Sequence, residues 1–310
     1  MTSRLNAMKE DLRNGVAAII VTYNPSIAQL SCLVNNLRNQ VPSIFIIDNN
    51  STNLLYSPPC ESVVLVRLSE NMGIAKAQNI GLSEAKLRGH EDFIFFDQDS
   101  IPAHDMVHHL LCTRTLASKQ SFNVAAVGPV HIDQDSCSDS IFISTQQDKV
   151  EKIEPEVYRK EGKSFAVCDF LIASGCLFSV KALETIGYME DELFIDCVDI
   201  EWGFRAKSKG WHCVASFEAK MHHKIGDAPL KIFGRSITTH SPLRHYYFYR
   251  NFYQLLKRAY IPSCWKWHTL VKSSIQAVIF SLFLSPRLEQ FKYILKGILH
   301  GLTGKSGKYE

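Results

Sequence analysis

Short apolar runs alternate with segments of helical spacing in the first hundred residues, and this alternation limits the possible folds most strongly. The apolar runs cover residues 16–22, 44–47, 63–66 and 93–96. The first of them, VAAIIVT, is apolar and β-branched almost throughout, as in a strand that is buried on both faces of a sheet. Strands that alternate with helices favour parallel pairing through right-handed crossovers. The sequence therefore predicts an α/β fold with a mostly parallel central sheet flanked by helices.

Three of these expected strands end in polar clusters. The clusters are TYN at 22–24, DNNST at 48–52 and DQDS at 97–100, and a loop at 71–73 precedes the next expected helix. Each cluster alone could be an ordinary turn. Because the carboxyl ends of parallel strands lie at one edge of a sheet, we expect the clusters to converge on one crevice. This convergence indicates a ligand-binding site.

The stretch DFIFFDQDSIP, at residues 92–102, indicates the chemistry of this crevice. Side chains alternate along a strand, so Asp97 and Asp99 are expected to point to the same side, with Gln98 turned away. Two carboxylates suit a hard divalent cation, Mg²⁺ or Mn²⁺, that holds a diphosphate. A turn without a metal is the alternative for this stretch taken alone.

The middle of the chain is less regular. Residues 131–163 are polar and lack a clear period, which predicts a surface excursion or a mobile flap. Gly175 interrupts an apolar run and suggests a bulge or a close approach of backbone to ligand. From Asp199 onwards a helix is expected, with acidic side chains near its positive N-terminus. The adjacent histidines at 222–223 would point apart on a strand, so at most one of them faces a site.

The charge is distributed unevenly along the chain. The net charge is +3, but residues 250–310 hold ten Lys and Arg against two acids, which leaves −5 on the first 249 residues. The basic residues alternate with apolar stretches, so an anionic membrane surface fits better than nucleic acid. Residues 275–284 are apolar but too short to span a bilayer. Residues 287–299 read as a basic amphipathic helix that lies on a membrane, or alternatively as a dimer or core helix.

Two further features indicate the compartment. The nine cysteines are scattered and have no metal-ligand spacing, which is typical of reduced thiols in a cytosolic protein. No apolar run follows the charges of residues 1–15, so a secretory signal is not expected. We therefore expect a cytoplasmic protein that binds peripherally to the inner face of a cell membrane.

The combination of VTYNP, DNNST, ENMGIAKAQNIG and FFDQDS resembles the inverting family-two glycosyltransferases, and more closely their bacterial rhamnosyltransferase branch. The similarity spans about residues 15–255. It implies a GT-A nucleotide-diphosphosugar transferase fold with a C-terminal helical extension. The implied division is a catalytic domain at 1–239, with a nucleotide-sugar half at about 15–130 and an acceptor half at about 164–239, followed by a basic amphipathic helical region at 240–310.

The resemblance also implies roles for individual residues. The donor nucleotide and its diphosphate would be held by Thr22, Tyr23, Asn24, Asp48, Asn71, Gly73, Asp97, Gln98 and Arg250. The metal ion would be bound by Asp97, Asp99 and His223, with Asp99 as the direct ligand and Asp97 on the ribose or on a metal-bound water. Arg250 and His223 would also help to stabilise the departing diphosphate.

The resemblance implies a catalytic base through an acidic motif that matches the family's pattern only in part. The family's Glu-Asp-x-Asp…Arg pattern is similar to Val198-Asp199-Ile200-Glu201…Arg205, and departs from it twice, with Val for the first Glu and Glu for the second Asp. The aligned base is Asp199. Asp196 and Glu201 are close enough in sequence to remain alternatives.

The expected function is metal-dependent transfer, with inversion, of a deoxysugar, L-rhamnose from dTDP-rhamnose, to a lipid-linked surface polysaccharide such as an O-antigen. One displacement needs a base at the acceptor hydroxyl and charge stabilisation on the leaving diphosphate. A sugar-nucleotidyltransferase is one alternative, but it would need a Gly-rich phosphate loop that TYNPS does not provide. A non-catalytic nucleotide-sugar-binding protein recruited to membranes is the other.

Overall fold

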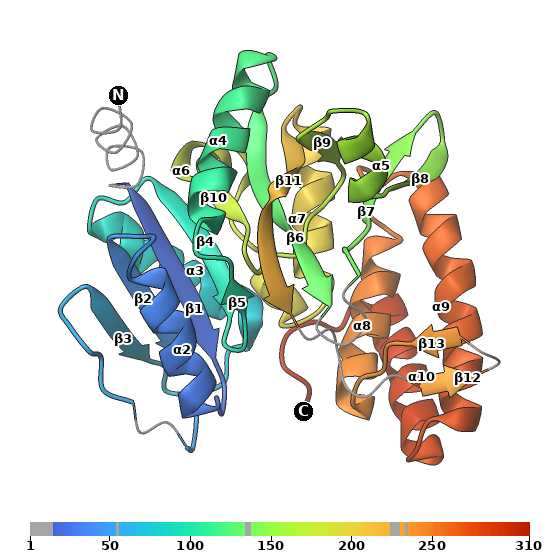
Figure 1. The fold of residues 1–310 in the computed structure, drawn as a ribbon. Helices are drawn as coiled ribbons and strands as arrows, with labels where there is room; N and C mark the ends of the chain where they lie inside the picture. Colours follow the sequence, from blue (N-terminus) through green and yellow to red (C-terminus); the bar gives the residue numbers. More distant parts are fainter. Residues whose placement is uncertain (1–14, 54–55, 134–137, 224–229, 233–234) are drawn as a thin grey trace.

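The central feature of the fold is a nine-stranded mixed sheet (Figure 1). The computed structural model describes residues 15–53, 56–133, 138–223, 230–232 and 235–310. The strands of the main sheet are β1 (Val16–Thr22), β2 (Ser43–Asp48), β3 (Val63–Arg67), β4 (Asp92–Asp97), β5 (Ile101–Pro102), β6 (Val124–Asp133), β9 (Phe165–Cys168), β10 (Leu177–Ser179) and β11 (His212–His223). Their order is β3-β2-β1-β4-β10-β6-β11-β5, and β9 pairs with β11.

The first four strands are parallel, as the sequence predicts. In register, Thr22 of β1 lies beside Asp48 of β2, and Val21 lies beside Asp97 of β4. The carboxyl ends of these strands therefore share one edge, which brings the polar clusters together. The second half of the sheet is less uniform, because β10 is antiparallel to both β4 and β6, while β6 and β11 are parallel.

Alternation along β1 divides its side chains between two buried layers. Ala17 and Ile19 face the layer that contains the apolar residues of α3 (Gly73–Leu87). Ala18 and Ile20 face the opposite layer, which is filled by α2 (Ile27–Leu37) and α4 (Met106–Lys119). Every residue of β1 is buried. The uniformly apolar run in the sequence thus corresponds to a strand covered by helices on both faces, as Figure 1 shows.

Residues 131–163 differ from the expected surface excursion. They contain the end of β6, a hairpin of β7 (Phe142–Gln146) and β8 (Lys149–Ile153), and helix α5 (Pro155–Lys160). Phe142 and Ile153 pair across the hairpin and are both buried in the main core. Ile143 and Val150 pack against the same core, so four apolar side chains hold a hairpin within a segment whose average hydrophobicity is low.

The middle helices connect the sheet to the C-terminal region. They are α6 (Val180–Ile186), the 3₁₀ helix η1 (Asp191–Leu193) and α7 (Val198–Ser208). Gly175, before β10, has a φ of +82°, and a Cβ there would lie 2.7 Å from the ring of Pro129. The expected close approach at Gly175 is therefore to Pro129 of β6.

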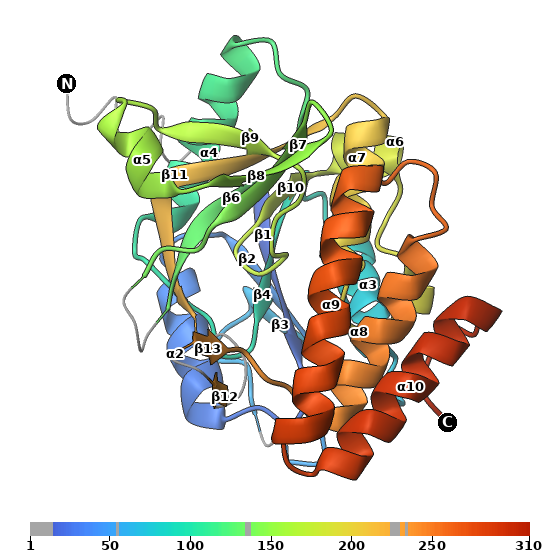
Figure 2. The same cartoon turned by 90° about the vertical axis from the view of Figure 1, so that its right-hand side faces the viewer.

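Three helices, α8 (Pro242–Leu255), α9 (Ser263–Phe283) and α10 (Arg287–Thr303), form the C-terminal region, beside a small hairpin of β12 (Leu230–Ile232) and β13 (Arg235–Ile237). They lie together on the side of the molecule that faces the viewer in Figure 2. Phe252 of α8 and Trp265 of α9 belong to the same buried cluster as the sheet, so residues 240–310 share a core with the rest of the chain. No helix in the described part of the chain is both long and apolar enough to cross a membrane.

Candidate active site

A cleft of about 700 Å³ opens at the carboxyl ends of β1 and β4, between the N-terminus of α3 and the helices α7 and α8. Seven of the residues expected at the site line it, namely Tyr23, Asn71, Gly73, Asp97, Gln98, Asp99 and Asp199. Thr22, Asn24, Asp48 and Arg250 do not line it. The side chain of His223 lies outside the described residues, although its backbone ends β11.

Thr22 and Asp48 support the strand-end loops from behind the cleft. The hydroxyl of Thr22 donates to Oδ1 of the buried Asp48 at 3.0 Å. The hydroxyl and backbone N–H of Ser51 donate to the same carboxylate at 2.5 and 3.1 Å. Asn24 has a φ of +49°, and its Oδ1 accepts from the backbone N–H of Thr52 at 2.9 Å. These contacts hold the loops after β1 and β2 together.

Tyr23 and Gln98 form a second link across the edge of the sheet. The backbone N–H of Tyr23 donates to Oε1 of Gln98 at 2.8 Å, and the Gln98 amide donates back to the Tyr23 carbonyl at 3.3 Å. The amide side chain is therefore fixed in direction and joins the loops after β1 and β4. Tyr23 itself is half exposed, with its ring available at the mouth of the cleft.

Asn49, which the sequence analysis did not single out, organises the start of α3. Its amide accepts from the backbone N–H of Met72 at 2.8 Å and donates to the carbonyl of Gly73 at 3.2 Å. Gly73 has a φ of +83°, and a Cβ there would lie 2.5 Å from the carbonyl oxygen of Phe194. That carbonyl accepts from the N–H of Ile74 at 2.6 Å. Only glycine allows this close approach of α3 to the segment that carries the acidic residues.

Asp97 and Asp99 both line the cleft, but not as neighbours on one strand face. β4 ends at Asp97, and Asp99 lies in the following turn, where the N–H of Ser100 donates to the Asp97 carbonyl at 3.1 Å. The hydroxyl of Ser174 accepts from the N–H of Asp97 at 3.0 Å and lies 2.8 Å from the Ser100 hydroxyl. Both aspartates thus lie on the cleft side as expected, but strand alternation was the wrong reason, because Asp99 follows β4 in a turn and Gln98 lines the cleft too.

These carboxylates allow a direct test of whether a divalent ion fits. The described residues contain no group of three His, Cys, Asp or Glu arranged to hold a metal. Asp97 and Asp99 are still a suitable donor set for Mg²⁺ or Mn²⁺, because such ions are commonly bound by one or two carboxylates together with substrate phosphates and water. The residues present fit an ion that binds together with a phosphorylated ligand.

Strained backbone marks the segment that directly precedes α7 and packs against the N-terminus of α3. Phe194, Asp196 and Cys197 have φ values of +65°, +64° and +62°, and all three line the cleft. Left-handed conformations of non-glycine residues cost of order 1–3 kcal/mol each, so they persist only where the surroundings impose them. We call residues 192–197 the strained loop.

Two buried residues of α8 impose this conformation. Nδ2 of Asn251 lies 2.8 Å from each of the carbonyl oxygens of Leu193, Ile195 and Asp196. The guanidinium of Arg250 donates to the carbonyl of Leu193 at 2.9 Å and to those of Glu192 and Gly307. Both side chains are fully buried. Arg250, expected at the donor diphosphate, therefore lies behind the strained loop, surrounded by main-chain carbonyls.

Asp199 has the most distinctive electrostatic environment in the cleft. It lies in the first turn of α7, and burial raises the pKa of its carboxyl from 3.8 to about 6. Burial is the largest cause of this net shift; the N–H of Ile200, which donates to Oδ1 at 2.9 Å, opposes it, and the neighbouring charges of Asp196 and Asp97 add to it. A carboxylate of this kind is ionised at neutral pH and is more basic than an ordinary aspartate.

The two alternative acids have cationic partners. Nη2 of Arg244, on α8, lies 2.7 Å from Oδ1 of Asp196, and both residues line the cleft. Glu201 is fully buried outside the cleft lining, where its two carboxylate oxygens accept from Nε and Nη2 of Arg205 at 2.8 and 2.9 Å. The i, i+4 spacing of Glu201 and Arg205 on α7 was the sequence signal for this pair.

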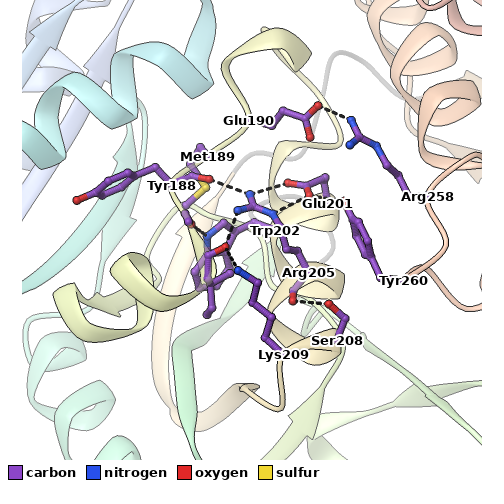
Figure 3. A network of polar contacts seen from close by, with 12 residues as sticks. Tyr188, Met189, Glu190, Glu201, Trp202, Arg205, Ser208, Lys209, Arg258 and Tyr260 are labelled. Carbon is purple, nitrogen blue, oxygen red and sulfur yellow. Dashed lines mark hydrogen bonds and ion pairs between the residues drawn. The ribbon is translucent and has the colours of Figure 1, made fainter.

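Figure 3 shows the wider network around Glu201. Tyr260 donates to Oε1 of Glu201 at 2.5 Å, and Arg205 also donates to the carbonyl of Tyr188 at 2.8 Å. Glu190 pairs with Arg258 beside them. The network joins α7 to the segment before η1 and to the α8–α9 connection. It fixes the helix that carries Asp199 and leaves Glu201 without access to a substrate hydroxyl.

Comparison with known proteins adds the following at the level of sequence. Residues 17–187 match the family described as Glycosyl transferase family 2. The chain is 34% identical over 303 residues to a protein named dTDP-rhamnosyl transferase RfbF from Shigella flexneri, and the alignment covers 96% of this chain and 97% of that protein. The family match includes the strand-end clusters and ends before the strained loop, whereas the alignment with the Shigella protein extends over nearly the whole chain.

Comparison with solved structures concerns the fold alone. A structure of GalNAc-T7 with UDP, GalNAc and Mn²⁺ superposes with a TM-score of 0.59 at 14% identity, covering 94% of this chain and 57% of that one. A structure of residues 1–349 of S. aureus TarS in complex with UDP-GlcNAc gives a TM-score of 0.55 at 14% identity, covering 94% of this chain and 81% of that one. These likenesses confirm the expected GT-A type of architecture.

Proposed function

Because the chain belongs to glycosyltransferase family 2, we propose that it transfers L-rhamnose, a deoxysugar, from dTDP-rhamnose to an acceptor hydroxyl with inversion of the anomeric carbon. The main support is the 34% identity, along nearly the whole chain, to the relative named a dTDP-rhamnosyl transferase. The family match speaks against both alternatives, the sugar-nucleotidyltransferase and the non-catalytic binding protein.

In the proposed mechanism Asp199 is the general base. It takes the proton of the acceptor hydroxyl as the oxygen forms its bond to the anomeric carbon and the bond to the diphosphate oxygen breaks. Its access to the cleft and its pKa of about 6 suit this role at neutral pH. Asp196 is neutralised by Arg244, and Glu201 is buried against Arg205, so both are less suited. One displacement inverts the configuration without a covalent intermediate.

Arg244 stabilises the leaving diphosphate in this mechanism, a role that was expected of Arg250 from the sequence. The guanidinium of Arg244 is part of the cleft wall, and its side chain is 42% exposed. The departing dTDP gains negative charge, and an arginine can bind phosphate oxygens in a bidentate manner. We therefore expect Arg244 to bind a phosphate oxygen of the donor through its other N–H groups, so that Asp196 stays paired with it in the donor complex.

Asp97 and Asp99 would hold a divalent ion, Mg²⁺ or Mn²⁺, together with the diphosphate. Bound there, the ion would supply Lewis-acid neutralisation of the leaving diphosphate. The distant structural neighbour that contains UDP and Mn²⁺ is consistent with such a site. On the nucleotide side, Tyr23, Asn71 and Gly73 would contact the donor directly, while Thr22, Asn24 and Asp48 would hold the loops that carry these contacts.

The proposal extends to the acceptor and to the place of action. We propose a lipid-linked surface polysaccharide of the O-antigen type as the acceptor, at the cytoplasmic face of a bacterial cell membrane to which the enzyme binds peripherally. The support is the group of large apolar side chains exposed on the C-terminal helices, together with the positive charge of that region.

The direct test is an incubation of the purified chain with dTDP-rhamnose, Mg²⁺ or Mn²⁺ and a lipid-linked acceptor, with dTDP release and glycan product both measured. The wild-type protein should form product, and dTDP-glucose or UDP-GlcNAc should not replace the donor. Asp199→Asn should still be stabilised thermally by the donor but should lose turnover. If the wild-type protein forms no glycan and does not hydrolyse the donor, the proposal is wrong.

A further inference from the structure

Helix α9 is apolar on the side that faces away from the protein. Its buried residues, Trp265, Ser273 and Phe280, lie on one side of the helix. Five large apolar side chains repeat at intervals of three or four on the opposite side, and each is between 56% and 66% exposed. They are Trp267, Val271, Ile275, Val278 and Leu282.

Helix α10 has the same arrangement. Its buried residues include Gly297 and Gly301, whose positions lie against the backbone of α8, where a Cβ would meet a carbonyl oxygen at 2.6 and 2.5 Å. Five large apolar residues on the other side are between 44% and 74% exposed. They are Leu288, Phe291, Leu295, Leu299 and Leu302.

We call these ten side chains the α9–α10 face. Helices α9 and α10 pack side by side on one flank of the molecule, on the right of Figure 1 and toward the viewer in Figure 2. The ten side chains are exposed there because they lie opposite the residues that each helix buries. The sequence analysis recognised such a side only for residues 287–299. A soluble surface rarely carries so many exposed apolar side chains together, so this face is expected to bind something.

The charges around the face distinguish between its two reasonable occupants. Residues 263–303 contain five Lys and Arg and one acid, Glu289. Lys272, Arg287 and Lys292 are exposed beside the apolar side chains. A second copy of this chain would bring the same cations together, which is unfavourable. An anionic lipid surface accepts the apolar side chains in its interface and pairs its headgroups with the cations.

We propose that the α9–α10 face docks this protein on an anionic membrane, with both helices lying in the plane of the interface. The inference deepens the proposed function and rests on it for the reason why docking is useful. Arg244 and Phe248 of α8 line the cleft, and α10 packs along α8 through Gly297 and Gly301. The helix that lines the cleft is therefore packed directly against a helix of the membrane-facing surface, which brings the cleft near an acceptor on a lipid carrier.

Trp267 provides a native probe for this docking. It is 66% exposed, whereas Trp202 and Trp265 are buried and Trp211 is half-buried. The full chain is titrated with phosphatidylcholine vesicles, with or without phosphatidylglycerol, and tryptophan emission is recorded. We expect a shift to shorter wavelength with anionic vesicles only, and Trp267→Phe should abolish the shift without preventing sedimentation with the vesicles.

Introducing acidic side chains tests the rest of the face. Ile275→Asp combined with Leu299→Asp should weaken vesicle partition at least about tenfold, since the lost insertion exceeds the ~1.4 kcal/mol that tenfold represents. Leu87→Asp is the matched control, because Leu87 is 82% exposed on α3 and is not part of the face. The control should partition like the wild type.

The outcomes separate this inference from the proposed function. Unchanged partition of the double variant, or an emission shift that persists in Trp267→Phe, would overturn membrane docking. So would light scattering that shows a wild-type dimer which the double variant converts to a monomer. Because vesicle partition needs no donor, it can fail while rhamnosyl transfer to a water-soluble acceptor succeeds. The reverse result would leave docking intact and contradict the proposed reaction.

Discussion

Replacing Asp199 by Asn should make the protein more stable at neutral pH while removing its activity. Burial raises the pKa of the Asp199 carboxyl from 3.8 to about 6, which means that the folded state disfavours the ionised form. The stability contributed by the protonated form is fully present below pH 3.8 and is lost as the pH rises to about 6. At pH 8 the shift lowers the free energy of unfolding by about 3 kcal/mol, because each pKa unit is worth about 1.4 kcal/mol.

An Asn side chain at position 199 is neutral at every pH and avoids this loss of folding stability. At pH 8 the variant Asp199→Asn should unfold at a temperature roughly 4–5 °C higher than the wild type, for a chain of this length. At pH 5 linkage predicts about half of the free-energy advantage, because the wild-type carboxyl is then largely protonated in the folded state. Thermal unfolding in metal-free buffer with EDTA measures both values. Turnover should fall by about 10²–10⁴ in the same variant.

A matched control is Asp148→Asn, because Asp148 is exposed in the turn between β7 and β8. This variant should keep the wild-type melting temperature at both pH values. In wild-type activity measurements, the rate should decline as the pH falls below about 6. The reasoning is refuted if Asp199→Asn is no more stable than the wild type at pH 8, or if its advantage does not shrink on acidification.

Three further substitutions test the support of the site. Asn251→Ala should cost about 2–4 kcal/mol in urea unfolding, because three loop carbonyls lose their donor, and should lower kcat more than it raises KM. Gly73→Ala should lower the melting temperature by several degrees, because the added Cβ would clash with Phe194 and because a φ of +83° is unfavourable for alanine. Arg205→Ala should destabilise by about 3–5 kcal/mol, because it leaves the Glu201 carboxylate buried and unpaired, and Arg205→Lys should recover part of this loss.

Local periodicity was sufficient to predict the strands at whose carboxyl ends the cleft opens. The four strands β1 to β4 lie within one residue of the expected runs, and their parallel pairing follows from the helices between them. Parallel pairing in turn places the strand-end clusters at one edge, so Tyr23, Asn71 and Asp97 could be assigned to one cleft from the sequence. The glycine at position 73 was also recognisable, although its partner Phe194 was not.

Periodicity could not predict which of two residues on the same helix reaches the cleft. Arg244 and Arg250 are six positions apart on α8, and the sequence analysis chose Arg250 for the leaving group. In the folded chain Arg244 reaches the cleft, whereas Arg250 turns to the carbonyls of the strained loop and of Gly307. The choice depends on what packs against each side of α8, and those partners lie more than fifty residues away along the chain.

The sequence by itself thus determined the type of sheet, the edge at which the cleft opens and the acidic character of the cleft, because these follow from periodicity and chain direction. Only the tertiary structure distinguished Asp199 from Asp196 and Glu201, since their different environments come from Arg244, Arg205 and Tyr260. It likewise decided which apolar side of α9 and α10 is buried against the protein and which faces outward. Amphipathic periodicity shows that a helix has an apolar side, but the neighbours that cover that side are known only from the fold.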